Sequence, residues 1–208
     1  MDNLKFVTDH LRSSVAPDPS QRQKSEAWRS RPPYQHVSDD EFGPVKWQAM
    51  CHCTRVQYQL SREKPLAAKY CHCRACQVLH AAPFQWCAIY HKTDVRFTRG
   101  VDSLMFYSSH EKTREYQVPT KVYCEHCSSP IMDEGRNMCL IFPELIDLGE
   151  TEEEHLTRRK VFEIDCHIFY SRRIVEVMDG KTKWSGIDKE SDILDDNGHG
   201  LHQLSSAI

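Results

Sequence analysis

Cys71-His72-Cys73-Arg74-Ala75-Cys76 is the stretch of sequence that decides the fold. Three cysteines within six residues allow one short loop to aim three sulfur atoms at a single tetrahedral zinc ion. Two pairs flank this triple, Cys51-His52-Cys53 before it and Cys124-Glu125-His126-Cys127 after it.

The first residues contain no uncharged apolar block typical of a secretion signal. We therefore expect a reducing, cytoplasmic setting, where clustered thiols hold metal more often than they form disulfides.

Seven clustered cysteines do not fill two closed four-sulfur sites, and they divide most simply into four and three. The triple at 71–76 would wrap one ion and leave one coordination position open, as catalytic zinc sites do. The pairs at 51/53 and 124/127 would then share a second, closed ion that clamps two distant segments of the chain. A competing division joins the first pair to part of the triple. We favour the first division, because the second leaves Cys124 and Cys127 short of partners.

The composition limits the class of protein. The chain of 208 residues is 39% hydrophobic and 27% charged, which fits one domain with polar flanks. Its apolar runs fall short of the roughly 20 residues that cross a bilayer, which argues against a membrane protein. Residues 51–140 carry twelve Lys and Arg against eight Asp and Glu. Two zinc ions on seven thiolates lower this net charge from +4 to +1. The sequence therefore argues against nucleic acid as a partner.

The spacing of apolar residues predicts a mainly β fold with few short helices. Alternation of apolar and polar residues at 56–60 and 162–168 is typical of half-buried strands, and it places His167 on a polar face. The other expected strands are 84–90, 95–97, 104–107, 121–123, 138–142 and 174–178, and the expected helices are 73–79 and 150–160.

The two ends of the chain differ in composition from the middle. Residues 1–44 are rich in proline and polar residues, which indicates an extended N-terminal arm. The candidate anchors of this arm on the domain surface are Trp28, Tyr34 and Phe42. Residues 188–208 are acidic and indicate a polar C-terminal tail. We therefore expect one zinc-binding domain over residues 45–187.

In order and spacing, these motifs resemble those of the glutathione-dependent formaldehyde-activating enzyme family, which includes centromere protein V. The resemblance rests on the Cys-x-Cys pair at 51–53, the Cys-His-Cys-x-x-Cys triple at 71–76, and the Cys-x-x-Cys-Ser-Ser-Pro segment at 124–130. The segment His167-Ile-Phe-Tyr-Ser171 also looks like a late strand of that family. The resemblance covers about residues 47–186 and implies an Mss4-like fold of packed antiparallel sheets stapled by zinc.

The resemblance also implies ligands and an activity. It implies two Zn²⁺ ions per chain, a structural one on Cys51, Cys53, Cys124 and Cys127 and a second one on Cys71, Cys73 and Cys76. The implied enzyme is a zinc-dependent carbon–sulfur lyase similar to S-(hydroxymethyl)glutathione synthase. It would add a thiol such as glutathione, its co-substrate, to formaldehyde or a related small carbonyl, or catalyse the reverse.

The candidate catalytic residues follow from this activity. Cys71, Cys73 and Cys76 would act through the open position of their zinc ion. His167 would orient the substrate or donate a hydrogen bond to a zinc-bound sulfur. The candidates to bind the carboxylates of glutathione are Arg172, Arg173, Lys181 and Lys183.

Three alternatives stay open. The chain has Ala49-Met50 and Thr54 where the family commonly has glycine, and Ile174-Val175 where Pro-Trp is usual, so a same-fold enzyme for another small molecule is one alternative. A non-catalytic zinc module that binds protein partners is the second. The third is a closed, structural second site, whose fourth ligand would be His167, Cys166, Cys139 or Cys87. For His72 and His126, inside the clusters, metal binding and an exposed position on a turn both remain possible.

Overall fold

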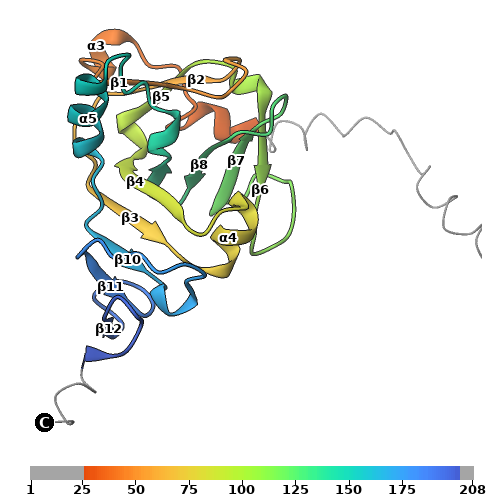
Figure 1. The fold of residues 1–208 in the computed structure, drawn as a ribbon. Coiled ribbons are helices and arrows are strands. Elements are labelled where there is room, and N and C mark those ends of the chain that lie inside the picture. Colours follow the sequence, from red (N-terminus) through yellow and green to blue (C-terminus); the bar gives the residue numbers. More distant parts are fainter. Residues whose placement is uncertain (1–25, 202–208) are drawn as a thin grey trace, which may run out of the picture.

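Two β-sheets form most of the fold in the computed structural model, which describes residues 26–201 (Figure 1). The smaller sheet has the strand order β1-β2-β5, with both pairings antiparallel. Its strands are β1 (Trp47–Met50), β2 (Gln57–Leu60) and β5 (Val95–Arg99). Strand β1 alternates buried and exposed side chains, and β2 alternates partly buried and buried ones. This alternation is expected for a sheet with one face on a core.

The larger sheet has the order β12-β11-β10-β3-β4-β9-β8-β7-β6. Its strands are β3 (Ala67–Cys71), β4 (Gln85–His91), β6 (Leu104–Tyr107), β7 (Thr120–Cys124), β8 (Pro130–Glu134), β9 (Met138–Ile141), β10 (Cys166–Ile168), β11 (Thr182–Trp184) and β12 (Ile193–Leu194). Strand β10 pairs in parallel with both β3 and β11, and the other neighbours are antiparallel. The mainly β class with two sheets is confirmed, and β10 makes the larger sheet mixed.

Helices are few and short, as expected. They are α3 (Asp39–Phe42), α4 (Arg74–His80) and α5 (Glu152–Val161), with 3-10 helices at Ala27–Ser30, Lys92–Asp94, Val101–Ser103, Pro143–Leu145 and Tyr170–Arg172. Helix α5 begins with a capping box between Thr151 and Glu154, which satisfies free N–H groups at its start. Within residues 26–201, no helix combines the length and the apolar character needed to cross a membrane.

Two of the expected strands differ from the structure. The strand predicted over 162–168 is confined to β10, because the chain is still closing helix α5 at Phe162, whose N–H donates to the carbonyl of Arg159. The strand predicted over 174–178 is absent, and this segment is an irregular, exposed loop in which Met178 is 78% exposed. Apolar alternation predicted a strand there, but the segment has no strand partner.

The core includes residues that precede the first strand. Trp28 and Tyr34 are buried in the same apolar cluster as Val56, Val122 and Ile141. The hydroxyl of Tyr34 donates to the buried carboxylate of Glu134 at 2.7 Å. Residues 26–34 therefore pack into the core of the domain rather than lying along its surface.

Residues 188–201 also join the fold, and the rest of the expected C-terminal tail lies outside the described residues. Strand β12 pairs with β11 and extends the sheet at the lower left of Figure 1. Asp188 forms an ion pair with Lys69 of β3 at 2.6 Å, and Asp196 pairs with Lys183 of β11 at 2.7 Å. The acidic composition of this segment thus reflects partners on the sheet as well as exposure to solvent.

Candidate metal centres

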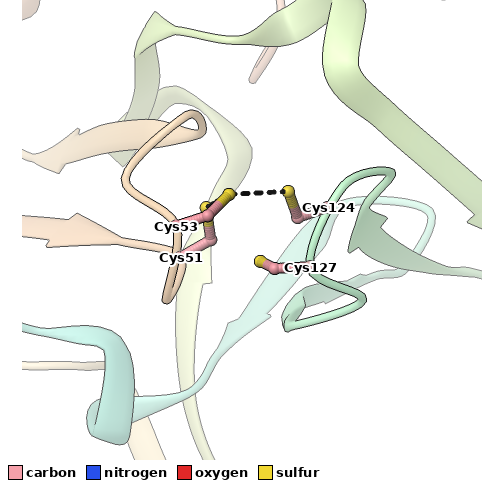
Figure 2. Close-up of side chains that lie close together, drawn as sticks. All are labelled: Cys51, Cys53, Cys124 and Cys127. Carbon is pink, nitrogen blue, oxygen red and sulfur yellow. Dashed lines mark hydrogen bonds between the residues drawn. The ribbon is translucent and has the colours of Figure 1, made fainter.

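Two turns that lie far apart in the chain bring four cysteines together (Figure 2). The sulfur atoms of Cys51, Cys53, Cys124 and Cys127 all lie within 4.8 Å of one another. The Sγ atoms are 3.5 Å apart for Cys51 and Cys53, and 3.7 Å apart for Cys53 and Cys124. Two sulfurs bound to one tetrahedral zinc ion at about 2.3 Å are separated by about 3.8 Å. The spacing and the chemistry of this donor set therefore fit zinc.

Each turn is shaped by the backbone around its first cysteine. After β1, the N–H of Val56 donates to the sulfur of Cys51 at 3.3 Å, and Thr54 adopts a positive φ of 61°. After β7, the N–H of Ser128 donates to the carbonyl of Cys124 at 2.9 Å, and Ser128 has a φ of 58°. Positive φ values favour glycine, so Thr54 and Ser128 adopt a backbone conformation that is uncommon for residues with a side chain.

Ser129 connects the two turns. Its Oγ accepts a hydrogen bond from the N–H of His52 at 3.3 Å and lies 3.2 Å from the sulfur of Cys127. Burial raises the pKa of Cys124 to about 12. Burial acts in the same direction on Cys127, but hydrogen bonds from the hydroxyl and N–H of Ser129 outweigh it and lower the pKa of Cys127 to about 5. A thiolate, the form that binds zinc, is thus favoured at Cys127.

The triple forms a second cluster, in which the three sulfur atoms also lie within 4.8 Å of one another. Cys71 ends β3, Cys73 precedes α4 and accepts from the N–H of Cys76 at 3.4 Å, and Cys76 lies in the first turn of the helix. Hydrogen bonds from the thiols of Cys71 and Cys76 lower the pKa of Cys73 to about 2, and the bond to Cys73 raises the pKa of Cys71 to about 12. The cluster thus consists of a thiolate at Cys73 that accepts hydrogen bonds from two neighbouring thiols. Three sulfur donors this close together fit a zinc ion.

None of the candidate fourth ligands joins this cluster. Within the described range 26–201, no His, Cys, Asp or Glu side chain lies within 4.8 Å of all three sulfurs. The thiol of Cys87 donates to the carbonyl of Lys69 at 3.5 Å. Cys139 and Cys166 are buried on β9 and β10. The described part of the chain therefore supplies three ligands here and four at the other cluster.

His72 and His167 form a buried pair beside the triple. His72 Nε2 lies 2.9 Å from His167 Nδ1, and His167 Nε2 lies 2.9 Å from Asp179 Oδ2. Both histidines are 0% exposed, so the expectation that His167 lies on a polar face is wrong, as is an exposed position for His72. The reason is that β10 is an inner strand covered by Tyr170, whose ring packs edge-on against both imidazoles. Burial lowers the pKa of His72 to about 4 and also lowers that of His167.

The two hydrogen bonds occupy both ring nitrogens of His167. In this geometry His167 has no N–H left to donate to a cysteine sulfur or to a substrate. The sequence made His167 a candidate to orient the substrate or to donate to a zinc-bound sulfur, whereas the partners of its ring in the structure are another histidine and a carboxylate. Asp179 was not predicted, because it follows the irregular loop that the sequence pattern presented as a strand.

The four basic residues expected to bind the carboxylates of glutathione differ in their surroundings. Lys183 is 1% exposed and pairs with two carboxylates, at 3.0 and 2.7 Å. Arg173 donates to backbone carbonyls and packs over a tyrosine ring. Lys181 pairs with Glu163 at 2.8 Å, and Arg172 is exposed. The buried Lys183 is therefore satisfied within the protein and does not face a ligand.

A cavity of about 310 Å³ is lined by residues from the strand and the helix that neighbour the triple, and by none of its three cysteines. One wall contains Gln85, the strand partner of Cys71, and His80, the last residue of the helix that carries Cys76. Ser129, which contacts the four-cysteine cluster, lines the cavity from another side. The remaining walls contain the apolar side chains of Phe84, Trp86, Phe142 and Leu145 and the carboxyl group of Glu144. The cavity thus lies between the elements that carry the two clusters.

A buried lysine reaches the polar wall of this cavity. Lys121 Nζ donates to Asp133 at 2.5 Å and to Gln85 at 3.2 Å, and it lies 3.4 Å from His80 Nε2. Burial opposes the charge of Lys121, but Asp133 and the sulfur of Cys76 outweigh it and raise the pKa of the ammonium group. Sequence reasoning missed this group. The only signal available was a lysine within the expected strand 121–123.

A family model described as glutathione-dependent formaldehyde-activating enzyme matches residues 46–172, a range that contains both cysteine clusters and His167. Among solved structures, a crystal structure of a Rhodobacter sphaeroides protein is similar, with 18% sequence identity over 56% of this chain and 96% of the other, and a TM-score of 0.41. The comparison with curated proteins found no match.

Proposed function

Since the chain belongs to the glutathione-dependent formaldehyde-activating enzyme family, we propose that it is a zinc-dependent carbon–sulfur lyase. Its reaction adds the sulfur of a thiol such as glutathione to the carbon of formaldehyde or a related small carbonyl, or runs in reverse. The proposal rests above all on the uneven division of the clustered cysteines. Four sulfurs gather at one place, and three gather at another with no fourth ligand from a His, Cys, Asp or Glu side chain among residues 26–201.

The two clusters have separate roles in this proposal. Cys51, Cys53, Cys124 and Cys127 hold a structural zinc ion, and Cys71, Cys73 and Cys76 hold the second. A zinc ion on three thiolates keeps one position for an outside ligand and favours the ionised form of a thiol bound there. Cys71 and Cys76 are buried while Cys73 is partly exposed, so a substrate would approach the cluster from the side of Cys73.

The cavity beside the triple would receive the substrate. Addition forms a carbon–sulfur bond, breaks the π bond of the carbonyl, and moves the thiol proton to the carbonyl oxygen. His80 lies on the cavity wall, where burial lowers its pKa and keeps its ring neutral, and its Nε2 accepts from the ammonium group of Lys121. Lys121, next to His80 and Gln85, offers positive charge where the carbonyl oxygen gains negative charge.

The test combines metal content with turnover. The unaltered chain should bind two zinc ions, and one of them should exchange quickly and respond to added glutathione. Cys73→Ser should lose the second zinc and most of its turnover of glutathione and formaldehyde, and keep the first zinc. Cys87→Ser is the matched control, because its hydroxyl can keep the hydrogen bond to the carbonyl of Lys69. Unchanged zinc content and turnover in Cys73→Ser would contradict the assignment. Two equally inert zinc ions would favour a non-catalytic module.

A further inference from the structure

A chain of hydrogen bonds runs from the C-terminal part of the fold to the middle of the three-cysteine motif. Lys183 Nζ donates to Asp179 Oδ1 at 3.0 Å, and Asp179 Oδ2 lies 2.9 Å from His167 Nε2. His167 Nδ1 in turn lies 2.9 Å from His72 Nε2. His72 stands between Cys71 and Cys73 in the sequence, so this chain of bonds ends at the residue that links two cysteines of the second cluster.

The carboxylate sets the direction of these bonds. An ionised carboxylate only accepts hydrogen bonds, so His167 donates to Asp179 from Nε2. The Nδ1 atom of a neutral His167 then carries a lone pair and accepts from the Nε2–H of His72. This leaves the Nδ1 atom of His72 without a proton, and that atom has no hydrogen-bond partner among the described residues. The geometry thus selects the same Nε2–H tautomer for both rings.

The backbone of His72 is held as firmly as its ring. Its N–H donates to the carbonyl of Ile168 on β10 at 3.0 Å, and its carbonyl accepts from Gln77 Nε2 at 3.0 Å. Gln77 is buried in α4 and also donates to the carbonyl of Arg172 at 2.9 Å. Because both histidines are 0% exposed, water does not compete for these bonds. His72 is therefore held by hydrogen bonds at its backbone N–H, its backbone carbonyl and its ring Nε2.

We propose that His167 and Asp179 are positioning residues for the three-cysteine site. By locking the ring of His72, they hold the backbone from which Cys71 and Cys73 project. The inference rests on the proposed function, since it takes these cysteines as metal ligands. Partners that orient the ligands of a metal site contribute about 10-fold to 100-fold to its affinity. The four-cysteine site lies on other turns, and it serves as an internal reference for the effect.

The experiment measures zinc affinity at both sites by competition with a chromophoric chelator. Asp179→Ala should weaken zinc binding at one site by about 10-fold or more and leave the other site unchanged. Asp196→Ala is the matched control, because Asp196 pairs with the same Lys183 but does not touch His167. Asp179→Glu should restore part of the affinity, since it returns a carboxylate to His167. Equal affinities in the Asp179→Ala and Asp196→Ala variants would overturn the inference.

A second measurement separates positioning from a general loss of structure. In nitrogen NMR of the side chains, His72 and His167 should both carry their proton on Nε2 in the unaltered chain. Asp179→Ala should remove this preference, whereas Asp196→Ala should keep it. If the tautomers differ from this pattern in the unaltered chain, the inference fails while the proposed function stands. If the unaltered chain binds a single zinc ion, the proposed function fails, and the inference fails with it.

Discussion

The sulfur atoms of Cys53 and Cys124 lie 3.7 Å apart, although 71 positions separate them in the sequence. Cys53 belongs to the connection between β1 and β2 of the smaller sheet, whereas Cys124 ends β7 of the larger one. A metal ion at this point would therefore join the two sheets. Because such a bond closes a long loop, it restricts the unfolded chain and stabilises the folded one.

Removal of this metal should destabilise the whole domain. Cys124→Ser is expected to lower the free energy of unfolding by about 4 kcal/mol or more, since it removes one of the four proposed ligands of the metal ion that joins the sheets. Urea unfolding of the zinc-loaded protein measures the change, with Cys166→Ser as the control for a buried thiol outside both clusters. A strong chelator should reproduce the effect of Cys124→Ser. An unchanged urea midpoint under chelator would contradict this role.

Residues 26–34 are expected to contribute to stability through Glu134. This carboxylate is 0% exposed and accepts from Tyr34 at 2.7 Å, Tyr116 at 2.8 Å and Lys92 at 2.5 Å. Glu134→Gln should therefore cost about 2 kcal/mol, because it removes the charge that three donors share. Thermal unfolding checks this value.

The matched control concerns an exposed bond made by the same segment. Arg29 pairs with Asp102 at 2.5 Å, but the Asp102 side chain is 91% exposed. Asp102→Asn should therefore change the free energy of unfolding by less than about 1 kcal/mol. If Glu134→Gln and Asp102→Asn lower the free energy of unfolding equally, burial of the carboxylate does not decide how much it contributes to stability.

Lys121 is expected to affect the binding of an anionic thiol. Its ammonium group lies beside the cavity and acts electrostatically on Cys76. Lys121→Met should raise the KM for glutathione about tenfold, equivalent to about 1.4 kcal/mol of lost binding free energy, and should retain both zinc ions. Lys69→Met is the control, because Lys69 is also a strand lysine in an ion pair, with Asp188 at 2.6 Å. The same KM in both variants would remove Lys121 from the substrate site.

Asp179 should make the stability depend on pH. Burial opposes its ionisation, but hydrogen bonds from Lys183 and His167 outweigh this effect and lower the pKa of its carboxyl from 3.8 to about 2. A group whose pKa is lower in the folded state contributes stability that is complete above the unfolded pKa. That contribution disappears as the pH falls through the folded pKa.

The comparison with Asp179→Asn isolates this contribution. The difference in unfolding free energy between the two chains should be constant above about pH 5 and should shrink as the pH falls from about 4 toward 2. Urea midpoints at fixed ionic strength measure it, and effects of pH common to both chains cancel in the difference. A difference that does not vary with pH would mean that the carboxyl keeps its ordinary pKa in the folded protein.

The spacing of the cysteines was sufficient to predict which sulfur atoms the fold brings together. Residues two to five positions apart can only meet within one turn, so Cys71, Cys73 and Cys76 group without any knowledge of the sheets. The helix expected over 73–79 is found as α4, Arg74–His80, and in the structure its start is marked by a local hydrogen bond at Cys73. Short-range patterns thus defined the clusters.

The surroundings of the clusters depend on contacts between distant segments. The pairing of β10 with β3 places His167 against His72, 95 positions away, and no local pattern indicates a parallel pairing at that point. Lys121, Gln85 and Asp133 meet because β7, β4 and β8 belong to one sheet. The burial of Tyr34 depends on Glu134, 100 positions away. Side chains that look exposed in a polar sequence become core residues through such contacts.

The central claim is that one metal ion is enclosed by four cysteines, while a second ion held by three is open to a small thiol. Cadmium-113 NMR of the cadmium-substituted chain, titrated with glutathione, tests it most directly. The account predicts two resonances, of which only one shifts on addition of glutathione, and that resonance should be missing in Cys73→Ser. A single resonance, or two resonances that glutathione leaves unmoved, would contradict it.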